Sequence, residues 1–124
     1  IVDNGNGVAY LLRGKIYSRQ GDNQKALDDL NKTVEMAGDM AWGYQERANI
    51  QHALGNTDAA LADYQKALTL DPSDSWTYAL MGDTLYDAGR RAEALTAYQT
   101  YTKLVGEAAV ESVRERIIEL QKTP

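Results

Sequence analysis

An internal repeat of 34 residues constrains the fold of this chain more than any other feature of the sequence. When the sequence is aligned on itself with that offset, Tyr10, Tyr44 and Tyr78 fall in register. Five further columns hold the same or a similar residue type: Gly14/Ala48/Gly82, Gly21/Gly55/Gly89, Ala26/Ala60/Ala94, Leu27/Leu61/Leu95 and Leu30/Tyr64/Tyr98. A period of this length indicates stacked units, each of which buries its apolar face on a neighbour.

Each copy of the repeat predicts a pair of helices. Between Tyr10 and Gln20 the apolar and small residues recur at steps of three and four, which is typical of an amphipathic helix. Gly21 favours the left-handed backbone that ends such a helix, and a second helix is expected from Gln24 to Met36. Small residues on the facing sides, as at Gly14, allow the two helices to approach closely.

The repeat boundaries predict an all-α fold of about seven helices. We expect repeats at residues 7–40, 41–74 and 75–106, separated by the helix-breaking residues Gly38, Pro72 and Gly106. Residues 107–124 predict one more amphipathic helix, which would cap the last repeat; its apolar face carries Val110, Val113, Ile117 and Leu120. Residues 1–6 are either the tail of a preceding repeat or a disordered remnant.

Composition argues against several functional classes. The net charge of −5 and the pI near 4.8 argue against a nucleic-acid surface, and no apolar run approaches the ~20 residues of a membrane-spanning helix. There is no cysteine, and His52 is the single histidine, so thiolate and imidazole metal clusters are excluded. Asp28, Asp29 and Asp63 are expected on solvated helix faces. We predict no enzyme activity, no cofactor and no metal.

These residues resemble the tetratricopeptide repeat family over about residues 7 to 106. The stretch from Tyr64 to Pro72, YQKALTLDP, is especially similar to the family's second-helix signature. Arg13 and Arg47 stand where the family often has Leu. The resemblance implies a right-handed α-solenoid of antiparallel helix pairs, in which the first helix of each pair lines a concave groove. In this family the groove usually accepts an extended peptide or a helix of a partner protein.

The resemblance also implies which residues face that groove. Carried over onto the first helices, the candidate partner-binding residues are Lys15, Arg19, Trp42, Gln45, Asn49, His52, Trp76, Asp83 and Tyr86. Trp42 and Trp76 are the candidate anchors, because large aromatic side chains dominate many binding surfaces. Val8, Leu11, Leu12 and Ala79 are expected on the same surface. Its charge is uneven, with Lys15 and Arg19 at one end and Asp83 and Asp87 at the other.

The sequence argues against one specific class of ligand, the C-terminal tails of the chaperones Hsp70 and Hsp90. Members of the family that hold the C-terminal tails of Hsp70 or Hsp90 use a clamp of two Lys, two Asn and one Arg. The corresponding positions here are Leu11, Lys15, Glu46, Trp76 and Leu80. Only Lys15 is basic, and it stands where Asn would be expected.

We therefore predict a protein-interaction module that binds a partner peptide or helix in its groove. One alternative is a self-assembling scaffold that associates through the ends of the solenoid. Another is a regulatory or targeting domain of a larger protein, since the chain begins with Ile1 instead of Met. The Ala-, Asp- and Gln-rich repeat style favours a bacterial source, with cytoplasmic and periplasmic placements both open.

Overall fold

The computed structural model describes residues 4–122, and within them it contains seven α-helices and one 3-10 turn. The helices are α1 (Asn4–Arg19), α2 (Asn23–Met36), α3 (Ala41–Ala53), α4 (Thr57–Leu70), α5 (Trp76–Asp87), α6 (Arg91–Val105) and α7 (Glu111–Lys122). The turn η1 (Gly106–Ala108) lies between α6 and α7. The expected all-α fold class with about seven helices is confirmed.

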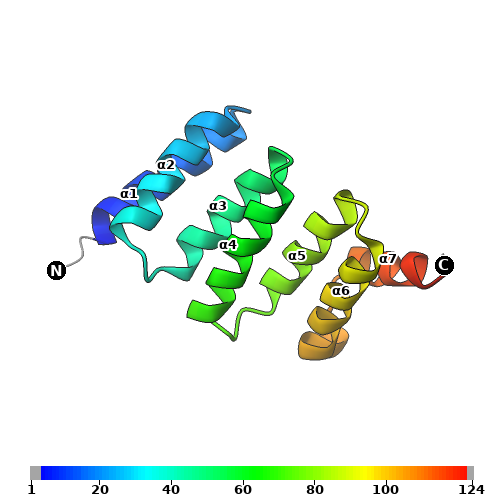
Figure 1. The fold of residues 1–124 in the computed structure, drawn as a ribbon. Coiled ribbons are helices and arrows are strands. Elements are labelled where there is room, and N and C mark those ends of the chain that lie inside the picture. Colours follow the sequence, from blue (N-terminus) through cyan, green and yellow to red (C-terminus); the bar gives the residue numbers. More distant parts are fainter. Residues whose placement is uncertain (1–3, 123–124) are drawn as a thin grey trace. The chain divides into compact units, whose positions relative to one another are not determined.

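The first six helices form three antiparallel pairs, α1 with α2, α3 with α4 and α5 with α6 (Figure 1). Glycine permits the close approach within a pair. A Cβ added at Gly14 would lie 2.3 Å from Cδ2 of Leu30, and one added at Gly82 would lie 2.5 Å from Cδ1 of Tyr98. The turns inside the pairs also depend on glycine, as predicted, because Gly21, Gly55 and Gly89 have φ of +83°, +81° and +77°.

The chain packs as two compact units, the first ending at Pro72 and the second beginning at Ser73. The first unit holds the two pairs α1/α2 and α3/α4. Its core contains Leu11, Ala26, Leu30 and Ile50, against which Tyr17, Leu27 and Met40 pack. Leu11 is fully buried there, so its expected place on the groove surface was wrong: its side chain points into the junction between the two pairs.

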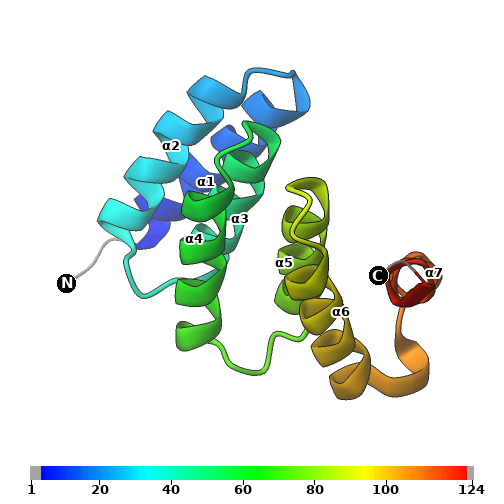
Figure 2. The same ribbon diagram turned by 45° about the vertical axis from the view of Figure 1, so that its right-hand side comes forward.

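The second unit holds α5, α6 and α7. Figure 2 shows α7 almost end-on while α6 lies across the view, so α7 crosses α6 rather than continuing the antiparallel pairing. Val113 and Leu120 bury the inner face of α7, whereas Ile118 is 53% exposed. Ala79 is also fully buried rather than on the expected groove surface. No helix among residues 4–122 combines the length and apolar character needed to cross a bilayer.

Two element boundaries differ from the sequence expectation. Helix α1 begins at Asn4, so residues 4–6 lie in the first helix; residues 1–3 lie outside the described range. The last helix begins at Glu111 instead of residue 107, because Gly106 adopts a φ of +60° and residues 106–108 form the 3-10 turn. Val110 therefore precedes the helix and is partly exposed.

Candidate functional site

A polar cavity of about 250 Å³ lies between α1 and α3 in the first unit. It is lined by Lys15, Ser18, Arg19, Glu46, Asn49 and Ile50. Three of the expected partner-binding residues are therefore brought together. A fourth lies beside them, since Lys15 Nζ is 5.4 Å from the centre of the Trp42 ring and the Trp42 side chain is 40% exposed. The cavity wall thus combines two cations, a carboxylate and an amide, and an exposed aromatic ring lies beside it.

Glu46 contacts both Lys15 and Trp42 at this cavity. Its Oε1 lies 3.6 Å from Lys15 Nζ and accepts a hydrogen bond of 3.2 Å from Trp42 Nε1. It therefore offsets the charge of Lys15 and fixes the indole of Trp42. Its register on the first helix of the second repeat placed Glu46 on the groove side, but it was not counted among the candidate partner-binding residues. The signal for its role is the spacing of four residues from Trp42, which places both side chains on one helix face.

Asn49 is held at the edge of the cavity by the neighbouring helix. The buried hydroxyl of Tyr64, on α4, donates a hydrogen bond to Asn49 Oδ1. This bond fixes the orientation of the amide before any ligand arrives. Gln45 and His52 lie on the same helix and are half-buried, but neither lines the cavity.

The expected groove residues of the second unit have a different environment. Trp76 is 43% exposed and meets the ring of Tyr101 edge-on, with the ring centres 5.6 Å apart. Asp83 and Tyr86 are two more of the expected partner-binding residues. Both are contacted by side chains of α7, the helix that was expected only to cap the last repeat.

The contacts from α7 form a polar network around Arg116. Its Nη1 lies 2.6 Å from Asp83 Oδ1 and 2.8 Å from the Tyr98 hydroxyl, and its guanidinium lies 4.5 Å from the Tyr86 ring centre. The Tyr86 hydroxyl donates hydrogen bonds of 2.9 and 2.8 Å to the two carboxylate oxygens of Glu119.

Burial, followed by the hydrogen bond that Tyr98 donates to Asp83, raises the pKa of Tyr98. The hydrogen bond that Tyr86 donates to Glu119 raises the pKa of Tyr86. The hydrogen bond that Arg116 donates to Tyr98 raises the pKa of Arg116. All of these shifts favour the protonated network, so Tyr86 and Tyr98 stay neutral beside a cationic Arg116.

Two carboxylates expected on solvated faces are instead buried. Asp29 and Asp63 are only 5% and 6% exposed, while Asp28 is exposed as predicted. Arg13 donates two hydrogen bonds of 2.8 Å to Asp29, and Arg47 donates bonds of 2.6 and 2.8 Å to Asp63. The bonds to Asp29 raise the pKa of Arg13. Arginine thus replaces the usual Leu because it has a carboxylate to bind on the paired helix.

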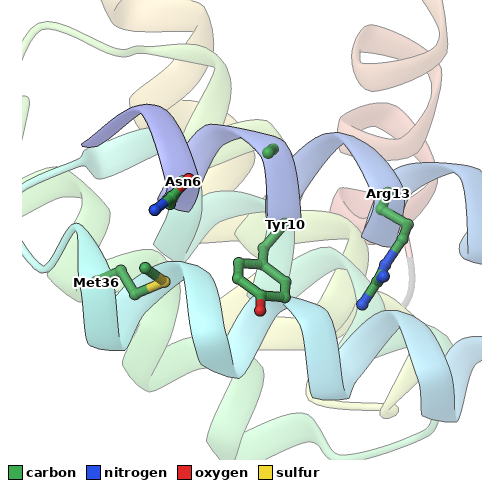
Figure 3. Close-up of a pocket in the computed structure, with 5 residues that line it drawn as sticks. Asn6, Tyr10, Arg13 and Met36 are labelled. Atoms are coloured by element: carbon green, nitrogen blue, oxygen red, sulfur yellow. The ribbon is translucent and has the colours of Figure 1, made fainter. Parts of the chain in front are cut away.

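The third repeat lacks this ion pair. The corresponding residues are Met81 and Ala97, and they line an apolar cavity of about 400 Å³ together with Tyr78, Leu85, Ala92, Glu93, Thr96 and Thr100. In the first repeat, Figure 3 shows the Arg13 guanidinium on the same side of α1 as the Tyr10 ring, where both residues line a cavity of about 410 Å³ with Asn6, Ala9 and Met36. Within residues 4–122 no group of three or more metal-ligating side chains gathers.

Comparisons with known proteins agree with this architecture. Sequence profiles described as "Tetratricopeptide repeat" match residues 8–40 and 41–74. The first tetratricopeptide domain of Spaghetti (RPAP3) is similar in structure, with a TM-score of 0.88 and 20% identity over 98% of this chain and 94% of that one. The tetratricopeptide domain of Arabidopsis OM64 is also similar, with a TM-score of 0.87 and 19% identity over 96% of this chain and 97% of that one.

A third similar structure is the Yersinia enterocolitica secretion chaperone SycD, with a TM-score of 0.85 and 13% identity over 92% of this chain and 91% of that one. No curated protein sequence matches the chain at a significant level. The two profile matches together span more than half of the chain. The chain belongs to the tetratricopeptide repeat family, whose domains are modules for protein–protein interaction.

Proposed function

We propose that the chain binds an extended segment of a partner protein at the cavity between α1 and α3. The observation that carries this proposal is the polar cavity beside an exposed tryptophan, with Lys15, Arg19 and Asn49 in its wall. Trp42 supplies apolar contact area, and the fixed amide of Asn49 pairs with the backbone of the segment. In the second unit, Trp76, Asp83 and Tyr86 are separate candidate contacts for the partner protein.

Peptide complexes of similar structures support a peptide as the ligand. The structure of the Spaghetti (RPAP3) domain is a complex with the HSP90 peptide SRMEEVD, and that of SycD is a complex with a peptide of the translocator YopD. Both likenesses are at low identity, so they concern the fold and leave the ligand to be argued from this chain's own residues.

The ligand of this chain differs from an acidic chaperone tail. Such a tail ends in a carboxylate and requires unopposed cations around it. In the first unit Leu11 is buried and Lys15 is opposed by Glu46 at 3.6 Å, so an acidic terminus would meet a nearby carboxylate. We therefore propose an internal segment with an apolar side chain for Trp42, and not a chain terminus.

The test is a selection of random displayed peptides on the whole chain, followed by titration calorimetry with the enriched sequence. Trp42→Ala and Asn49→Ala should each weaken binding, Trp42→Ala by about tenfold or more. Lys32→Ala removes an exposed charge on α2 and serves as the matched control, which should bind like the wild type. Equal binding by Trp42→Ala and Lys32→Ala would contradict the proposal.

A further inference from the structure

In the second and third repeats, a tyrosine of the second helix donates a hydrogen bond to a polar side chain of the first helix at the same repeat position. In α3 the Tyr64 hydroxyl donates to Asn49, and in α5, one repeat further on, the Tyr98 hydroxyl donates to Asp83. Asn49 lines the cavity to which the proposed function assigns the partner. Asp83 is therefore the corresponding ligand-facing position of the third repeat, with a carboxylate in place of a neutral amide.

A guanidinium already lies at this carboxylate. Arg116 of α7 contacts the Asp83 carboxylate at 2.6 Å, the Tyr98 hydroxyl at 2.8 Å and the face of the Tyr86 ring at 4.5 Å from its centre. A charged acceptor, a neutral acceptor and an aromatic face are the three kinds of contact that a planar guanidinium uses together. Tyr86 completes the set only in this repeat, because His52 stands at its place in α3.

The helix that supplies Arg116 is short and buries few of its side chains. It has 12 residues, which is too short for stability of its own, and within it only Val113 and Leu120 are buried. It is joined to α6 through the 3-10 turn that begins at Gly106. The side chains of Arg116 and Asp83 are 37% and 34% exposed. A competing side chain in solution can therefore reach the carboxylate, and a partly exposed ion pair opposes exchange only weakly.

We propose that Asp83, Tyr86 and Tyr98 form a guanidinium-binding subsite, which Arg116 fills until an arginine side chain of the partner protein displaces it. This inference rests on the proposed function, in which the chain binds a peptide segment. It adds that the partner protein carries an arginine for the third repeat, and that Arg116 of α7 competes with this arginine. Arginine is favoured over lysine because an ammonium lacks the flat surface that stacks on Tyr86.

The experiment titrates the full chain with the probe peptide acetyl-Ala-Ala-Arg-Ala-Ala-amide and follows backbone amide NMR signals. In Arg116→Ala the subsite is vacant, so saturable shifts are expected around Asp83, Tyr86 and Tyr98. The wild type should require about tenfold more peptide, because Arg116 competes. Asp83→Asn combined with Arg116→Ala should show no saturable shift, and neither should Arg116→Ala with the same peptide carrying citrulline.

A second measurement on the wild type tests whether the arginine of the peptide displaces Arg116 or whether Arg116 stays bound to Asp83. Hydrogen exchange of the α7 amides should accelerate as the arginine peptide is added, because bound peptide releases the helix; the citrulline peptide should leave it unchanged. If circular dichroism shows that Arg116→Ala is unfolded, this measurement decides alone. Unchanged α7 exchange at saturating peptide, or no saturable shift in a folded Arg116→Ala, overturns the inference.

The outcome is distinguishable from the test of the proposed function. Trp42→Ala changes the cavity in the first unit and should leave binding of the arginine peptide unaltered. Failure of the peptide selection with success of this titration would refute the cavity and keep the subsite. The reverse result would keep the cavity and refute the subsite.

Discussion

Arg116 of α7 lies 2.6 Å from Asp83 of α5, measured between Nη1 and Oδ1, although 33 positions separate them in the chain. The same Arg116 nitrogen donates to the Tyr98 hydroxyl on α6. One side chain therefore ties the last helix to both members of the third pair.

Removing this tie should destabilise the chain moderately. Arg116→Ala is expected to lower the free energy of unfolding by about 1 kcal/mol, because the lost hydrogen bonds involve charged groups but solvent screens them. Urea denaturation followed by circular dichroism measures the change. Lys122→Ala, an exposed cation on the same helix, should have almost no effect. Equal losses in the two variants would show that the contacts of Arg116 contribute nothing.

The buried ion pair between Arg47 and Asp63 should be more sensitive. Asp63→Asn is expected to cost about 2 kcal/mol, because it leaves a guanidinium that is only 21% exposed without its carboxylate. Asp28→Asn, on an exposed carboxylate of α2, is the matched control and should cost almost nothing. Urea denaturation compares the two variants.

The third repeat suggests a further variant of the same ion pair. Arg47→Met with Asp63→Ala places the residues of the third repeat in the second. We expect the double variant to lose less stability than the sum of the two single variants, with a coupling of about 1 kcal/mol or more, since neither charge is left alone. Additive losses in a double-mutant cycle would contradict this expectation.

The helix pairs could be predicted from the sequence because their signals repeat. Tyr10, Tyr44 and Tyr78 mark the same place three times, and Gly21, Gly55 and Gly89 end a helix three times. An accidental match in one copy is corrected by the other two. The predicted starting residues of α1 and α7 were wrong. Each helix lies at one end of the series of repeats, where no second copy supports the assignment of its first residue.

The environment of single side chains was harder to predict. Asp29 and Asp63 were placed in solvent because each was judged on its own helix, where it lies outside the apolar stripe. The missed signal is the pairing of arginine and aspartate 16 positions apart, which occurs twice in the first two repeats. Arg116 offered no such signal, since α7 has no counterpart elsewhere in the chain.

Two glycines of the second unit should respond differently to the same substitution. Gly82→Ala is expected to cost about 3 kcal/mol, because the new Cβ would lie 2.5 Å from the Tyr98 ring, which is fixed by its hydrogen bond to Asp83. Gly89→Ala should cost about 1 kcal/mol, because its Cβ would meet nothing within 4 Å and only the φ of +77° is unfavourable. Urea midpoints for the two variants test the order, and a larger loss in Gly89→Ala would contradict the close packing of α5 on α6.

Stability at high pH should depend on Tyr98. Burial and the hydrogen bond to Asp83 raise its pKa in the folded chain above the ordinary value of about 10. Above pH ~10 the unfolded chain loses the tyrosine proton while the folded chain keeps it, so the unfolded state binds fewer protons and the free energy of unfolding falls as pH rises. Below that pH the contribution is fully present.

Tyr98→Phe isolates this contribution, because phenylalanine keeps the ring and leaves Asp83 bound to Arg116. We expect the free energy of unfolding of the wild type to fall between pH 9 and 11 more steeply than that of Tyr98→Phe, by up to about 1.4 kcal/mol for each pH unit above 10. Urea denaturation at several pH values gives both slopes. Parallel slopes would mean that the Tyr98 hydroxyl titrates alike in the folded and unfolded chains, and that its bond to Asp83 does not stabilise the protonated form.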